Sequence, residues 1–193
     1  MERLWSDFLN SEWHDWRGSG KSGDRLGQDK WQEYFLGSWG LKATVPADED
    51  EILHMRKFRK QLHELASRLA DDSQMNTEDW ALLNEYMKLG VVRRQFAGEG
   101  EGIELKLTPI NDDWKQVLAE IAASFGQTLL EGGDGRIRIC DNPDCRWVFY
   151  DDTRNRTKKY CDDKTCGNLM KVRRFRARKK AEHDPDEMEN GSS

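Results

Sequence analysis

The sequence predicts an α+β protein: a mainly α-helical N-terminal domain with a β-hairpin, then a small C-terminal module in which a second hairpin and a basic helix surround four cysteines. Three observations favour this class. Apolar residues recur every three or four positions over 52–69 and 114–129, as in amphipathic helices. Residues 103–107 instead alternate between apolar and charged, as in a strand with one buried face. All four cysteines lie within the 27 residues from Cys140 to Cys166, so a second, smaller unit is expected there.

We expect four segments along the chain. Residues 1–131 form the helical domain, and the glycine-rich stretch 132–135 is a linker. Residues 136–180 form the cysteine module. The last segment, 181–193, is acidic and has no aromatic residue, a composition that predicts a disordered tail.

The helices of the N-terminal domain are predicted from apolar spacing and end signals. The first 40 residues predict a short helix, a loop, and a second helix over about 28–39 that Gly40 ends. A long amphipathic helix is expected over 48–71, with acidic residues at its start, where the helix dipole favours them. The next helix begins in "NTEDW", where Thr77 can cap it, and Gly90 closes it.

A β-hairpin is expected between that helix and the last helix of the domain. Ile103, Leu105 and Leu107 alternate with Glu104 and Lys106, which predicts one buried and one solvated face. Helical spacing then returns over 111–131. The domain is therefore expected to end in a helix that leads into the linker.

Charge is distributed unevenly over the chain. Residues 136–180 contain 15 of the 31 Lys and Arg and 6 of the 36 Asp and Glu, a charge of +9, whereas the other 16 basic and 30 acidic residues carry −14. This asymmetry indicates a polyanion-binding module on an acidic body. The sequence has no run of about 20 apolar residues and no signal-peptide pattern at its start, so we expect a cytoplasmic protein without membrane partners.

The cysteines form two close pairs, C-x4-C, separated by 15 residues. Cytoplasmic disulfides are rare, so this clustering favours metal binding. The candidate ligands are Cys140, Cys145, Cys161 and Cys166. Four thiolates suit one tetrahedral Zn²⁺ and leave no open coordination position, as in a structural site. An iron–sulfur cluster and a redox disulfide switch are the alternatives.

The two strands of the cysteine module and its helix are predicted from "RIRICDNPDCRWVFYDD" and the residues after Cys166. Trp147 and Phe149 would share one face of the hairpin, and Val148 and Tyr150 the other. In the helix, Leu169, Val172 and Phe175 or Arg176 are expected to pack on the hairpin, while the remaining cations face outward.

The basic residues of this module predict a nucleic-acid interface, because fixed cations neutralise phosphates and a helix fits the major groove of duplex DNA. The candidate contacts are Arg154, Arg156, Lys158, Lys159, Lys171, Arg173, Arg174, Arg176, Arg178 and Lys179. The main alternative is an RNA-binding or ribosome-associated zinc protein, in which Trp147 or Tyr150 would stack on bases. One helix makes a small footprint, which predicts a homodimer.

Other functions have weaker support in the sequence. The segment "GSGKSG" lacks the spacing of a phosphate-binding loop. His14 and Asp15 have no nucleophile beside them, so we expect no enzyme activity. The tryptophans at 5, 13 and 16 are more typical of a core cluster than of a ligand cage, although a small-molecule effector on the N-terminal domain is a further candidate partner.

The segment "C-x4-C-RWVFYDDTRNRTKKYC-x4-CGN", followed by "KVRRFRARKK", resembles the CGNR-type zinc finger of bacterial proteins. The region that opens with "DFLNSEWHDWRG" is similar to the ABATE domain that usually precedes this finger. The resemblance implies a bacterial, stress-induced transcription regulator in which the four cysteines bind zinc and the Arg and Lys of "TRNRTKK" and "KVRRFRARKK" face DNA. This chain departs from the motif at Leu169, where the family has Arg. If that Arg touches DNA, affinity or site choice differs here; if it packs on the hairpin, Leu169 substitutes for it.

Overall fold

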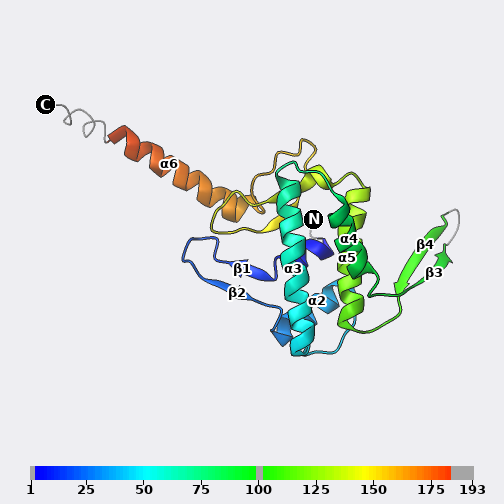
Figure 1. Cartoon of the computed structure of the whole chain (residues 1–193). Coiled ribbons are helices and arrows are strands. Elements are labelled where there is room, and N and C mark those ends of the chain that lie inside the picture. Colours follow the sequence, from blue (N-terminus) through cyan, green and yellow to red (C-terminus); the bar gives the residue numbers. More distant parts are fainter. Residues whose placement is uncertain (1–2, 99–101, 184–193) are drawn as a thin grey trace.

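The computed structural model describes residues 3–98 and 102–183. In Figure 1, α3 and α5 run side by side through the body, while α6 and the β3–β4 hairpin project from opposite ends. The elements, in chain order, are α1 (Leu4–Leu9), β1 (Glu12–His14), β2 (Ser22–Asp24), α2 (Asp29–Trp39), α3 (Glu49–Ala70), α4 (Thr77–Met87), β3 (Val92–Ala97), β4 (Glu104–Pro109), α5 (Trp114–Leu130), the 3-10 turn η1 (Asp134–Arg136), β5 (Ile137–Ile139), β6 (Val148–Tyr150), the π-helical turn η2 (Asp163–Gly167) and α6 (Asn168–His183). The predicted α+β class is confirmed.

The predicted helices begin and end at residues whose side chains or backbone conformation favour a helix terminus. Asp48 caps α3 and accepts a hydrogen bond from the Glu51 backbone NH at 2.8 Å, while the Glu51 carboxylate accepts one from the Asp48 backbone NH at 2.9 Å. This reciprocal pair satisfies two NH groups that the helix itself leaves unpaired. Gly40 ends α2 with a φ of +63°, which glycine adopts at little cost.

Two predicted roles at the ends of α4 are wrong. The N-cap is Asn76, whose side chain accepts from the Asp79 backbone NH at 2.9 Å, and Thr77 is the first helical residue. Gly90 is not the C-cap, because α4 ends at Met87 with Lys88 as cap. A Cβ at Gly90 would lie 2.6 Å from the Ala119 Cβ, so glycine is needed here for close approach to α5.

The core of the helical domain lies among α1, α2, α3, α4 and α5 and is rich in aromatic residues. Trp5 is fully buried and meets Phe125 edge-on at 5.3 Å between ring centres. Phe58 is also fully buried and stacks on Tyr86. Trp5 therefore has the core position that the sequence favours, whereas Trp13 and Trp16 lie in a separate place described below. No helix in the described part of the chain is long and apolar enough to cross a membrane.

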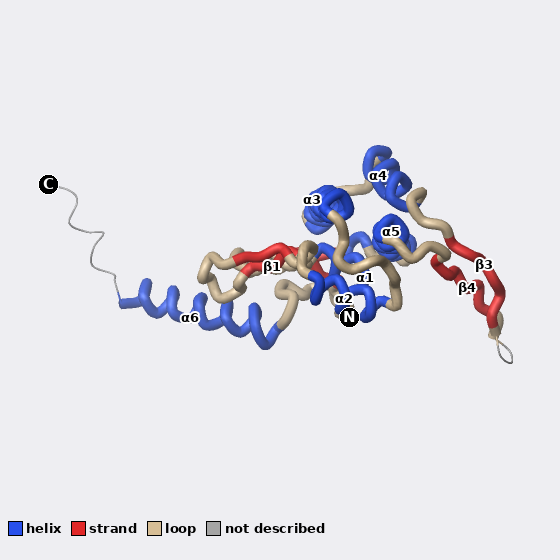
Figure 2. Tube along the Cα trace, turned by 90° about the horizontal axis from the view of Figure 1, so that it is seen from below, coloured by secondary structure: helices blue, strands red, loops and turns tan. Residues whose placement is uncertain are grey.

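The β3–β4 hairpin differs from its prediction. It is antiparallel, with Phe96 opposite Leu105, but neither face is buried. Phe96 is 80% exposed and Ile103 is 84% exposed. The predicted buried face is wrong because the hairpin extends away from the helices in both views (Figures 1 and 2), so no described element packs over it.

A second hairpin, β1–β2, lies between α1 and α2, where the sequence predicts a short helix and a loop but no strand. Its strands have three residues each, too short to show an alternating pattern. Trp13 pairs with Gly23, and a Cβ at Gly23 would lie 2.7 Å from the Trp13 Nε1, so the indole covers the glycine. Arg59 of α3 attaches the hairpin to the body by donating to the Asp24 carboxylate at 2.7 Å.

The third hairpin, β5–β6, joins the cysteine module to the helical domain. Ile137 and Val148 are buried in the same core as Trp5. The side chain of Asn10, just after α1, donates to the Val148 carbonyl at 2.9 Å and accepts from the Val148 backbone NH at 3.0 Å. The core is thus continuous across the segment expected to be a linker.

Candidate metal centre and basic helix

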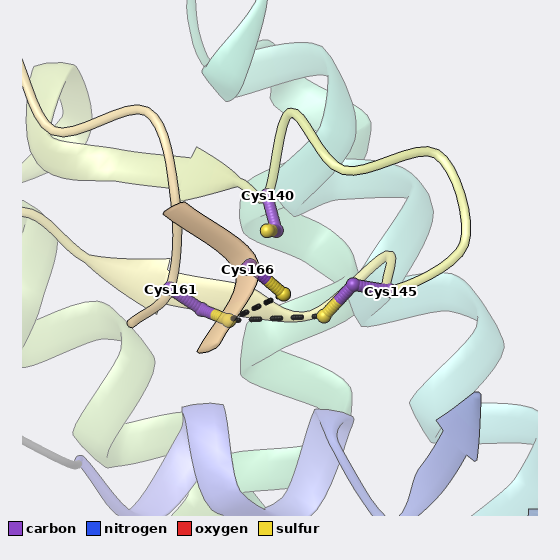
Figure 3. A group of neighbouring side chains, drawn as sticks. All are labelled: Cys140, Cys145, Cys161 and Cys166. Carbon is purple, nitrogen blue, oxygen red and sulfur yellow. Dashed lines mark hydrogen bonds between the residues drawn. The ribbon is translucent and has the colours of Figure 1, made fainter. Parts of the chain in front are cut away.

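The four cysteine sulfurs converge on one point, as Figure 3 shows. The Sγ atoms of Cys145 and Cys161 are 3.7 Å apart, those of Cys161 and Cys166 are 3.9 Å apart, and all four lie within 4.8 Å of one another. A tetrahedral zinc site with bonds of about 2.3 Å has edges of about 3.8 Å. All four cysteines are free. The geometry fits one structural Zn²⁺ with four thiolate ligands.

Three of the four cysteines are placed by short backbone elements. Cys140 follows β5, and its NH donates to the Trp147 carbonyl at 2.9 Å. Cys145 closes a turn in which its NH donates to the Asn142 carbonyl at 2.9 Å. Cys166 lies in η2, whose cap Asp162 accepts from the Thr165 backbone NH at 2.7 Å. The two C-x4-C segments therefore form different structures, a turn and a helical turn.

Asn142 supports the metal centre from outside the ligand set. It is fully buried. Its side-chain NH2 donates to the Cys166 Sγ at 3.3 Å and to the Trp16 carbonyl at 2.8 Å. A donor beside a thiolate stabilises its negative charge, and such outer partners orient the ligands. Asn142 also connects the metal centre to the loop of the β1–β2 hairpin.

Three of the thiols, those of Cys140, Cys145 and Cys161, interact through hydrogen bonds that shift their pKa values. Hydrogen bonds from the thiols of Cys145 and Cys161 to a thiolate on Cys140 lower the pKa of Cys140 to about 2. The same bond to Cys140 raises the pKa of Cys145 to about 12, and bonds to both neighbours raise the pKa of Cys161 far above its usual range. One of these three sulfurs therefore ionises readily, and a divalent cation in place of the remaining thiol protons would favour ionisation of the other two.

The two faces of β6 pack in different places, as the sequence predicts. Phe149 is buried against the cysteines with Trp147, Tyr160 and Trp16 around it. Val148 and Tyr150 belong instead to the helical core. The strand thus separates the metal centre from the helical domain by a single layer of backbone.

The basic loop between β6 and Cys161 is organised by a buried carboxylate. Asp151 accepts from the Thr153 backbone NH and the Lys158 backbone NH, each at 2.9 Å, and from the Thr153 hydroxyl at 2.5 Å. Burial alone would raise the pKa of Asp151, but these hydrogen bonds outweigh it and the pKa is lowered. The loop is therefore fixed at both ends, and it exposes Arg154 and Arg156 to solvent.

Helix α6 does not pack on the hairpin over its length. Val172 is 44% exposed and Phe175 is 49% exposed, so the predicted apolar contact of these two residues is wrong. The helix leaves the body within its first turns (Figures 1 and 2). Only Leu169, Met170 and Arg173 are half-buried in the part of α6 whose side chains are described.

Arg173 fixes the base of α6 instead of facing outward as predicted. Its guanidinium donates to the Asp144 carboxylate at 2.6 Å and to the Arg17 carbonyl at 3.0 Å. Gly18 leaves room for this pair, because a Cβ there would lie 2.8 Å from an Arg173 nitrogen. The other predicted contacts on the helix are exposed: Lys171, Arg174, Arg176, Arg178 and Lys179.

A cavity of about 480 Å³ lies between the β1–β2 hairpin and the cysteines. Its lining includes the indoles of Trp13, Trp16 and Trp147, together with Arg17 and Arg25. The sequence allows a ligand cage at Trp13 and Trp16, but nothing in it predicts that Trp147 of the cysteine module lines the same cavity.

The two residues considered for catalysis have structural contacts. His14 lies in β1, with its Nε2 4.0 Å from a Glu12 carboxylate oxygen. Asp15 accepts from the Arg17 backbone NH at 3.1 Å, and its pKa is lowered by the Ser19 hydroxyl and by that NH. Asp15 thus stabilises the turn between β1 and β2.

These features define a class of protein: a zinc finger whose hairpin is built into a helical domain and whose last element is a protruding basic helix. Residues 136–179 match the CGNR zinc finger family. Residues 2–132 match the ABATE family, described as "Putative stress-induced transcription regulator". The chain belongs to the ABATE family and carries a CGNR zinc finger, as the resemblance in the sequence implied. Neither is a family of enzymes. A comparison with curated proteins finds no match.

Proposed function

We propose that this protein is a zinc-dependent transcription regulator that binds duplex DNA through α6 and the loop 151–160. The observation that carries the proposal is the exposure of α6. Arg173 is tied to the body, while Lys171, Arg174, Arg176, Arg178 and Lys179 remain exposed on a helix that stands clear of the protein. A free helix of this kind fits the major groove, and its cations pair with phosphates.

The zinc centre gives this helix its direction. Cys166 lies in η2, directly before α6, so a metal that holds Cys166 also holds the first turn of the helix. The Arg173–Asp144 ion pair adds a second attachment one turn further along. Bound zinc supplies no chemistry in this proposal beyond holding the four sulfurs together. The cations are thereby presented as a fixed array, which reduces the ordering cost of binding.

The alternative, an RNA-binding protein that stacks bases on aromatic residues, has less support. Tyr150 packs in the helical core, and the Arg3 guanidinium covers its ring at 4.0 Å. Trp147 is half-buried beside the cysteines. Tyr150 therefore lacks the open face that stacking on a base requires, and Trp147 is accessible only in part.

We also propose that the protein senses a small-molecule effector. The cavity between the β1–β2 hairpin and the cysteines has a size typical of small-molecule sites, and we assign the effector to it. Its walls come from both parts of the chain, so an effector there would contact the hairpin and the metal centre together. We place this activity in the cytoplasm, where the thiols stay reduced.

The experiment that tests the proposal is affinity selection from a random duplex DNA pool with zinc-loaded full-length protein at near-physiological salt. Chelated protein and an RNA pool are run in parallel. Enrichment of one duplex motif that is lost on chelation supports the proposal. Retention without a motif, or preference for RNA, contradicts it.

The matched variants for this selection change charge equally at two places. Arg174→Ala/Arg178→Ala removes two cations from α6, whereas Arg93→Ala/Lys106→Ala removes two from the distant β3–β4 hairpin. We expect only the first pair to lose the motif. Equal loss in both variants would mean that total charge, and not α6, determines binding.

A further inference from the structure

The β3–β4 hairpin, here called the arm (residues 92–98 and 102–109), is amphipathic. Its register places Phe96 opposite Leu105 and Arg94 opposite Leu107. Because side chains alternate across a strand, Phe96, Leu105 and Leu107 share one face, and Ile103, just before β4, continues it. Arg94 is the single charged residue at the described strand positions of this face.

The opposite face of the arm is polar. Arg93, Gln95, Glu104 and Lys106 occupy the alternate positions, and all four are exposed. A hairpin with this pattern normally packs its apolar face on a core. A two-stranded hairpin without such a cover is marginally stable in water.

The apolar face of the arm is nevertheless in water. Phe96 and Ile103 are 80% and 84% exposed, and Leu105 and Leu107 are 53% and 55% exposed. With roughly 200 Å² for a large apolar residue, these four side chains leave about 500 Å² of apolar surface exposed. This area is in the range of the largest apolar patch on a typical monomer, and such patches are often functional.

We propose that this face is covered by the same face of a second copy of the chain, in a two-fold symmetric contact. A standard interface buries about 800 Å² per partner, so the four side chains alone would supply more than half of it. Since two-fold symmetry brings a patch against itself, the patch must be free of self-repulsion. The apolar face meets this condition, because Arg94 can extend its long side chain to water at the edge of the arm.

The position of the arm fits this partner. The arm and α6 project from opposite ends of the molecule in both views (Figures 1 and 2). A dimer formed through the arms therefore leaves both basic helices free. The proposal does not depend on DNA binding, since association can be measured with protein alone.

The test compares two double variants that remove surface side chains from opposite faces of the arm. Phe96→Ser/Leu105→Ser changes the apolar face, and Gln95→Ser/Lys106→Ser changes the polar face. Sedimentation equilibrium over 0.1 to 100 μM, on the order of the range that standard interfaces span, gives the dimer dissociation constant of each zinc-loaded protein. Because all four side chains are exposed in one copy, neither variant should lower the thermal unfolding midpoint measured at low protein concentration.

We expect wild-type protein and Gln95→Ser/Lys106→Ser to dimerise alike, and Phe96→Ser/Leu105→Ser to weaken the dimer at least about 100-fold, as loss of a central apolar anchor does. A wild-type protein that stays monomeric throughout the range would overturn the proposal. So would a dimer that survives in Phe96→Ser/Leu105→Ser, or one that both variants weaken equally.

Discussion

Asn142 offers the sharpest test of the metal centre, because a single side chain joins a zinc ligand to the β1–β2 hairpin. Asn142→Ala removes the donor at 3.3 Å from the Cys166 Sγ and the donor at 2.8 Å from the Trp16 carbonyl. Outer partners of this kind contribute about 10- to 100-fold in metal affinity, which corresponds to about 1.4 to 2.8 kcal/mol. We expect the zinc affinity of Asn142→Ala to fall within that range.

The assay is competition for zinc with a chromogenic chelator, read as the zinc transferred at equilibrium. Asn142→Asp is a second variant of nearly the same shape. It replaces the donor with a negative charge beside the thiolates, so we expect a larger loss of affinity than for alanine. Asn155→Ala, in the exposed part of the basic loop, is the control and should bind zinc as the wild type does.

Two results would refute this reasoning. Zinc affinity within about two-fold of wild type in Asn142→Ala would mean that the hydrogen bond to Cys166 does not support the metal. A loss of affinity that is larger for alanine than for aspartate would mean that packing, and not the charge environment of the sulfur, is what Asn142 provides.

Three further predictions concern the rest of the molecule. Chelation of zinc should abolish DNA binding while the helical core stays folded, because Ile137 and Val148 belong to that core. Calorimetry of the chelated protein should still show an unfolding transition. Complete unfolding on chelation would contradict this prediction. Burial raises the pKa of Asp24, but hydrogen bonds from Arg59 and Arg56 outweigh it and bring the pKa to about 2. The stability that this depressed pKa contributes is present above the ordinary pKa of 3.8 and is lost as the pH falls toward 2, so urea unfolding of Asp24→Asn should depend less on pH in that window. Arg174→Ala/Arg178→Ala should reduce the slope of log affinity against log salt by about 1.8 if each residue contacts one phosphate, and an unchanged slope would place the contacts elsewhere.

The parts of the fold that depend on local chemistry could be predicted from the sequence. Helix α3 follows from its apolar spacing and from the Asp48–Glu51 cap. The convergence of the four sulfurs follows from two close pairs and a hairpin-sized spacer. The opposite packing of Phe149 and of Val148 and Tyr150 in β6 follows from strand alternation.

The parts that depend on distant partners could not be predicted. Alternation identifies the apolar face of β3–β4 but not what covers it, so exposure of Phe96 could only be learned from the structure. The same holds for α6, where a three-residue step suggested packing of Val172 and Phe175. Arg173 looks like its basic neighbours in sequence, and its different role comes from Asp144, 29 residues away.

Strand β6 is shared between the helical core and the metal centre. Val148 belongs to the helical core, while its neighbour Phe149 packs on the cysteines, so the two sites cannot change shape independently. Metal binding at the cysteines and packing of the helical core are therefore expected to be coupled, each stabilising the other. We therefore expect loss of the metal to lower the stability of the helical core.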